Sequence, residues 1–136
     1  MNIKITSTTT LTEIKESFNK EFPFLKIEFF RTGHSVGEAN AGYDLITENI
    51  PVGKLNKDLT AEILSIRPVQ SVASLEQAFQ QLGLPIQVFR KQKNVWLETT
   101  KTDKLTLFHQ NSIGKEASAP VAPAEPADRY LEDGQY

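Results

Sequence analysis

The chain has 136 residues, with 15 basic and 17 acidic side chains, a hydrophobic share of 39% and no cysteine. These values are typical of one soluble globular domain, and they exclude a disulfide framework, a thiolate nucleophile and a zinc–thiolate or iron–sulfur site. The longest apolar run, residues 95–97, is too short to span a membrane, and the N-terminus lacks the apolar stretch of a secretory signal. We therefore expect a cytoplasmic protein without a membrane segment.

The charge is unevenly distributed along the chain. Residues 1–115 carry 14 Lys and Arg against 12 Asp and Glu, a net charge of +2, whereas residues 116–136 carry one Arg and five acids, a net charge of −4. Alanine is frequent between residues 117 and 127, and prolines stand at every third position from Pro120 to Pro126. Such prolines remove backbone donors and favour extended chain. Residues 116–136 are therefore expected to form a flexible, Pro/Ala-rich acidic tail outside a domain of residues 1–115.

The first part of the domain, about residues 1–56, predicts the order β-α-β-β. Ile3 and Ile5 alternate with polar neighbours, as in a half-buried strand. Thr10 and Glu13 have the spacing of a capping box, and the apolar side chains after it lie on one helical face. Strands are expected at residues 25–31 and, after a glycine-rich loop, at residues 43–46.

The second part, about residues 60–111, predicts the same order. Leu64 and Ile66 indicate a strand, and a helix follows from Ser71 to Gly83, which is the expected left-handed cap. A hairpin is expected from strands at residues 86–90 and 95–100, joined by a polar turn. Residues 51–61 and 105–111 are ambiguous and are compatible with short helical turns.

The two parts align as an internal repeat. Their first strands and helices match at an offset of 61 residues, and the strands beginning at Ile27 and Ile86 match at an offset of 59. We therefore expect an α+β fold, a two-layer sandwich of two β-α-β-β repeats. Its two helices would pack on one face of an antiparallel or mixed sheet, about an approximate two-fold axis.

The second unit resembles a group of small bacterial proteins. The residues that carry the likeness are Ser71, Val72, Leu75 and Phe79, followed by the segment of residues 87–90 and Trp96. The likeness is good over about residues 60–111 and looser over residues 1–31. That group is an uncharacterised family with no assigned activity, so the resemblance implies a compact duplicated domain and supplies no catalytic residue.

No motif of site chemistry stands out. His34 and His109 are 75 positions apart and have no partner at metal-ligand spacing, so we expect no metal site. The loop from Gly33 to Gly37 lacks the lysine of a P-loop and the spacing of a dinucleotide fold. Glu98 and Asp103 are close in sequence, but nothing predicts an enclosed pocket around them. We expect no catalytic residue and no cofactor.

The sequence is therefore interpreted as a non-catalytic protein–protein interaction or scaffold domain with an acidic tether, with self-association through a sheet edge as one form. The candidate partner-binding residues lie in a glycine loop, a basic hairpin and the tail: Gly33, His34, Gly37, Gly42, Arg90, Lys91, Lys93, Trp96, Tyr130, Leu131 and Tyr136. The alternative is a small nucleic-acid-binding protein. It would use the hairpin cations, Arg31 and an exposed Trp96 for phosphate and base contacts, although a net charge of +2 is small for that role. Three readings of the tail stay open: a recognition element, a solubilising segment, or a ligand of the basic hairpin.

Overall fold

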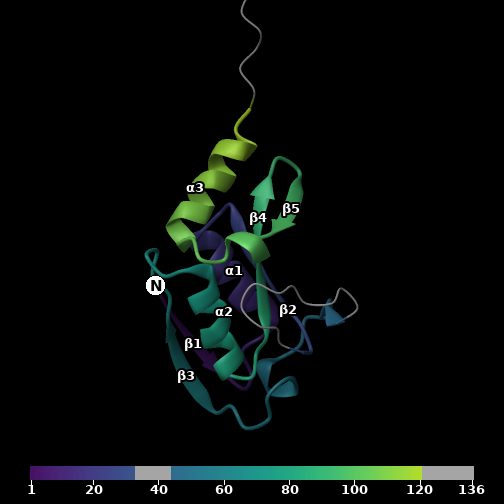
Figure 1. The fold of residues 1–136 in the computed structure, drawn as a ribbon. Helices are drawn as coiled ribbons and strands as arrows, with labels where there is room; N and C mark the ends of the chain where they lie inside the picture. The colour runs from purple at the N-terminus through teal and green to yellow at the C-terminus, as the bar shows by residue number, and fades with distance from the viewer. Residues whose placement is uncertain (33–43, 121–136) are drawn as a thin grey trace, which may run out of the picture.

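The structure is a computed structural model and describes residues 1–32 and 44–120 (Figure 1). The described residues form an α+β fold, as the sequence predicts, but with five strands and three α-helices in place of the six strands and two helices of two β-α-β-β units. In chain order these are β1 (Asn2–Thr6), α1 (Leu11–Glu21), β2 (Leu25–Phe29), β3 (Ala61–Ser65), α2 (Val72–Gln81), β4 (Ile86–Gln92), β5 (Val95–Glu98) and α3 (Leu107–Ser118). Two short 3-10 turns are present as well, η2 (Val52–Lys54) and η3 (Thr100–Thr102).

The strands form two antiparallel sheets where one sheet was expected. β1 pairs with β3, and β4 lies between β2 and β5 in the second sheet. In Figure 1 the β1–β3 pair lies on one side of α2 and the β2–β4 pair lies on the other. Ile5 and Ile27 are fully buried in one hydrophobic cluster. The two sheets therefore share a core without sharing an edge.

Local sequence signals set the helix ends. The Thr10 hydroxyl accepts a hydrogen bond from the Glu13 amide at 3.2 Å, and the Glu13 carboxylate accepts one from the Thr10 amide at 2.8 Å. This is the expected capping box, which satisfies two amides at the start of α1. Gly83 has a φ of +74° after α2, and the Leu84 amide donates to the Phe79 carbonyl at 3.0 Å. The predicted left-handed cap is thus confirmed.

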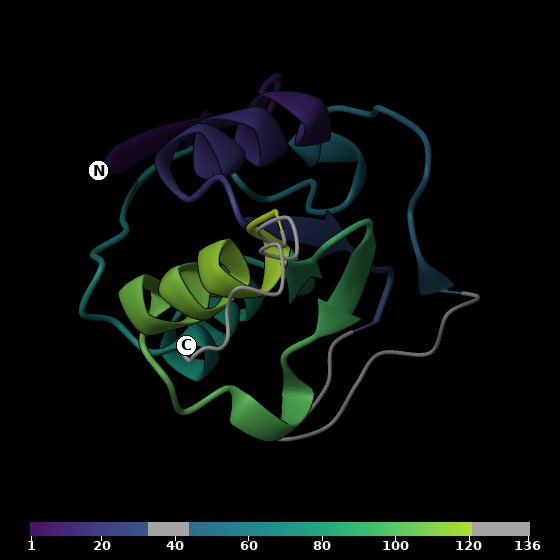
Figure 2. The ribbon, with the colours of Figure 1, turned by 90° about the horizontal axis from the view of Figure 1, so that it is seen from above.

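The strands expected at residues 25–31, 86–90 and 95–100 span residues 25–29, 86–92 and 95–98. Two other expected segments differ more. Residues 44–46 do not form a strand, because Leu45 makes only an isolated bridge to Phe30. The ambiguous segment after residue 105 becomes α3, a helix of 12 residues that is capped by the Thr106 hydroxyl. α3 packs against β4, beside the β4–β5 hairpin in Figure 2, and continues through Ser118. α3 therefore includes residues 116–118, the first three residues of the expected tail.

The β1–β3 pairing and the β2–β4 pairing each bring together residues that the proposed repeat aligns. Ile3 is the Cα partner of Leu64 in the first sheet, and Glu28 is the Cα partner of Gln87 in the second. The start of each of the first two helices also receives a similar backbone contact, beside an isolated bridge. The Leu11 amide donates to the Ile50 carbonyl and the Val72 amide to the Leu105 carbonyl, both at 3.0 Å. Such pairings are compatible with a local two-fold axis, and the duplication itself stays a prediction.

Candidate functional site

The outer face of the three-stranded sheet carries two partly exposed aromatic side chains. Phe89 is the Cα partner of Lys26, and Trp96 is the Cα partner of Lys91. Directly opposed residues of an antiparallel pair share one face, so these side chains lie together. They border a hollow of about 430 Å³, called here the outer cleft, which is lined by Lys26, Glu28, Phe30, Leu45, Phe89, Trp96 and Glu98.

Lys26 lies over the Phe89 and Trp96 rings of the outer cleft. Its ammonium lies 5.0 Å from the centre of the Trp96 ring and 5.6 Å from that of Phe89, within cation–π range. The same ammonium is 3.2 Å from a Glu28 carboxylate oxygen, and Lys15 Nζ is 3.1 Å from the other oxygen. Lys26 is therefore already paired, and the cleft offers an aromatic wall with mixed charge.

β5 forms an open edge of this sheet in the part of the chain that the structure describes. The Lys91 amide donates to the Phe24 carbonyl at 2.9 Å, so the polar backbone groups of Lys91 point toward β2. Because the pairs of an antiparallel ladder alternate, the backbone groups of its partner Trp96 point to the open edge, as do those of Glu98. Val95 is 56% exposed and Leu97 is 37% exposed. This edge thus combines outward backbone donors and acceptors with exposed apolar side chains.

Arg90 lies on the other face of β4, away from the outer cleft. Its strand partner Leu25 is fully buried. Arg90 Nη1 donates to Gln110 Oε1 at 2.8 Å, and Gln110 Nε2 donates to the Thr102 carbonyl at 2.7 Å. These bonds join β4, α3 and η3. The structure therefore separates Arg90 from Lys91, Lys93 and Trp96 and gives it a packing role.

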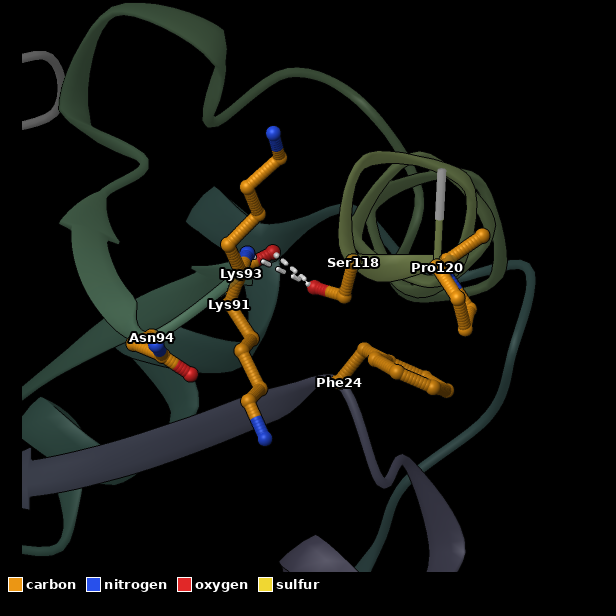
Figure 3. Close-up of a pocket in the computed structure, with 7 residues that line it drawn as sticks. Phe24, Lys91, Lys93, Asn94, Ser118 and Pro120 are labelled. Carbon is orange, nitrogen blue, oxygen red and sulfur yellow. Dashed lines mark hydrogen bonds between the residues drawn. The ribbon is translucent and has the colours of Figure 1, made fainter. Parts of the chain in front are cut away.

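A second hollow lies where the β4–β5 turn meets the end of α3. The Ser118 hydroxyl accepts from the Lys93 amide at 3.0 Å and donates to the Lys91 carbonyl at 3.4 Å (Figure 3). Lys93 has a φ of +56° in this turn. The hollow, called here the turn cleft, has a volume of about 340 Å³ and is lined by Phe24, Lys91, Lys93, Asn94, Ser118, Ala119 and Pro120. No carboxylate is among these described lining residues.

The other sequence candidates lie partly outside the residues that the structure describes. Seven of them lie outside the described residues: Gly33, His34, Gly37, Gly42, Tyr130, Leu131 and Tyr136. Arg31 makes an exposed ion pair with Glu48 at 3.7 Å. Glu98 is exposed on β5 whereas Asp103 is buried, and residues 1–32 and 44–120 contain no group of three metal-ligating side chains.

Sequence reasoning missed the contribution of Lys26 and Phe89 to the outer cleft. Strand alternation could have indicated it, since Phe89, Lys91 and the outward positions of the hairpin share one face. Comparison with protein-family models, curated proteins and solved structures finds no match to this chain. Within the described ranges, no helix is long and apolar enough to cross a membrane.

Proposed function

We propose that the protein is a non-catalytic binding module that accepts an extended segment of a partner protein along β5. The observation that carries this proposal is the open edge of β5 beside the outer cleft. Outward backbone groups at Trp96 and Glu98 can form a new strand ladder, which supplies affinity. The cleft beside the Trp96 ring can receive an apolar side chain of the partner, which supplies specificity.

The exposure of Val95 and Leu97 supports the same proposal. An edge strand with apolar side chains is a template for pairing with another chain, and proteins normally blunt such edges with charge or cover them. β5 is short and begins two residues after Lys93, and both features limit uncontrolled pairing. An edge that is short but apolar favours a specific, reversible partner over an obligate one.

The alternative is binding of single-stranded nucleic acid on the same face. Phe89 and Trp96 could stack on bases, with Lys91 close to the phosphates. Two features disfavour it: Lys26 already lies over both rings, and the carboxylates of Glu28 and Glu98 line the cleft. A titration with a single-stranded oligonucleotide at two salt concentrations distinguishes the two functions. Tight binding that weakens with salt would favour the nucleic-acid alternative.

Selection from a displayed library of random peptides tests the proposal. Peptides would be enriched on the full chain and then compared on two variants at one position. Glu98→Pro removes an outward amide without removing a bond to β4, and Glu98→Thr changes the same side chain but keeps the amide. We expect enriched peptides to bind the wild-type protein and Glu98→Thr and to lose at least tenfold in affinity on Glu98→Pro, a change of about 1.4 kcal/mol. Equal binding to both variants, or no enrichment, would contradict strand addition.

A further inference from the structure

The described part of the chain ends at Pro120, at the edge of the turn cleft. Ser118 is bonded to the backbone of both Lys91 and Lys93, and Pro120 lines the cleft. Figure 3 shows Lys91 and Lys93 on one side of this opening and Ser118 and Pro120 on the other, with Phe24 below the end of α3 and the two lysine side chains pointing in opposite directions. The starting point of residues 121–136 is thereby fixed beside two cations and an aromatic ring.

The turn cleft and the segment that follows it have complementary charge. The described ion pairs involve neither Lys91 nor Lys93. The segment of residues 121–136 has a net charge of −3, since it contains one arginine and four acids: Glu125, Asp128, Glu132 and Asp133. It also contains Tyr130 and Leu131, which are suited to contact with Phe24.

The length of the segment allows it to return to the cleft. Glu125 is five residues beyond Pro120, a reach of about 17 Å in extended chain, and Asp128 reaches about 27 Å. Because the segment is tethered at the cleft, its effective local concentration is on the order of millimolar. Several carboxylates can therefore occupy the surroundings of both lysines without a long closed loop.

We propose that residues 121–136 dock on the turn cleft of their own chain, with their carboxylates at Lys91 and Lys93 and an apolar side chain against Phe24. This is the intramolecular form of the charge complementarity between the tail and the hairpin. It does not depend on a partner at β5. The two proposals can therefore fail separately. Peptide binding at β5 without tail docking would contradict only this proposal, and tail docking without peptide binding would contradict only the proposed function.

Energy transfer from the single tryptophan provides a direct test in the full chain. Trp96 is the only tryptophan, and the protein has no cysteine. Gln135→Cys therefore permits one acceptor dye near the end of the segment. We expect efficient transfer at low salt that falls as salt is raised, because the Debye length shrinks from about 10 Å at 0.1 M to about 3 Å at 1 M.

Three sets of substitutions in this labelled chain decide the question. Lys91→Gln with Lys93→Gln should lower the transfer efficiency at low salt, and so should neutralising the four acids of residues 121–136. Lys54→Gln with Lys57→Gln makes the same charge change outside the cleft and should leave it unchanged. Donor lifetimes of the unlabelled variants correct for any effect of Lys91 on Trp96. Equal transfer in all variants would overturn the proposal, and transfer that rises with protein concentration would overturn its intramolecular form.

Discussion

Glu28 and Gln87 face each other directly across β2 and β4, and each is bonded to a different helix. Glu28 pairs with Lys15 of α1 at 3.1 Å, and Gln87 donates to Glu76 of α2 at 3.3 Å. Lys15 and Glu76 are themselves separated by 61 positions, the offset of the proposed repeat. Residues that the proposed repeat aligns in α1 and α2 therefore contact residues that it aligns in β2 and β4. The first contact is an ion pair and the second is a hydrogen bond.

The Glu76 contact should contribute more to stability than the Lys15 contact. Glu76 is buried, and its carboxylate also accepts from the Val88 amide at 2.9 Å, so Glu76→Ala leaves a buried donor unsatisfied. We expect Glu76→Ala to lower the free energy of unfolding by about 1–3 kcal/mol. Lys15→Ala removes a partly exposed ion pair and should cost less than about 1 kcal/mol. Urea denaturation of both variants measures the difference, and an equal loss would contradict this account.

Arg90 should affect stability and not binding. Arg90→Met keeps the apolar part of the side chain but leaves Gln110 Oε1 without its donor, and we expect a loss of about 1–3 kcal/mol. Lys91→Gln, at the next position but on the outer face, should change stability by less than about 0.5 kcal/mol. Thermal or urea unfolding provides the comparison. A stable Arg90→Met protein with weakened peptide binding would show that Arg90 belongs to the site.

Gly114 allows α3 to approach the sheet closely. A Cβ at this position would lie 2.9 Å from Phe24 Cβ and 3.1 Å from Arg90 Cγ. Alanine improves helix propensity by about 1 kcal/mol, but overpacking costs about 1–3 kcal/mol, so we expect Gly114→Ala to be destabilising overall. Lys115→Ala, at the exposed neighbouring position, is the control and should change little. A higher midpoint of urea unfolding for Gly114→Ala would refute the close approach.

Ser118 should stabilise the β4–β5 turn locally. Its hydroxyl is the acceptor for the Lys93 amide at 3.0 Å, and Ser118→Ala removes that acceptor. We expect faster hydrogen exchange at the Lys93 amide while the midpoint of global unfolding stays nearly the same, since the turn is exposed. Unchanged exchange at Lys93 would mean that the end of α3 is not bonded to the turn in solution.

The features predicted correctly from sequence are those that depend on near neighbours. Thr10 and Glu13, or Gly83 and Leu84, lie within a few positions of their partners, so spacing alone indicates the caps. The division into two sheets depends on which distant strands pair, and apolar alternation is the same for either arrangement.

Neither the third helix nor the side of the sheet on which Arg90 lies is predicted from the sequence, for different reasons. The buried face of α3 consists of Leu107, Gln110 and Gly114, so it has only one large apolar side chain and gives little helical periodicity. Arg90 shares the inner face of β4 with the fully buried Val88, which alternation along the strand could have indicated. Adjacent basic residues of the hairpin therefore do not form one cluster, because Arg90 and Lys91 face opposite sides of the sheet.

Hydrogen exchange of the β5 amides, measured with and without a peptide selected on the full chain, tests the central claim most directly. In the free protein the outward amides of Trp96 and Glu98 should exchange rapidly, because no strand partner is bonded to them among the described residues. The bound peptide is expected to slow exchange at both amides and to shift the resonances of the Trp96 ring. Binding that leaves both amides unprotected while protecting β1, β3 or α3 would contradict the claim.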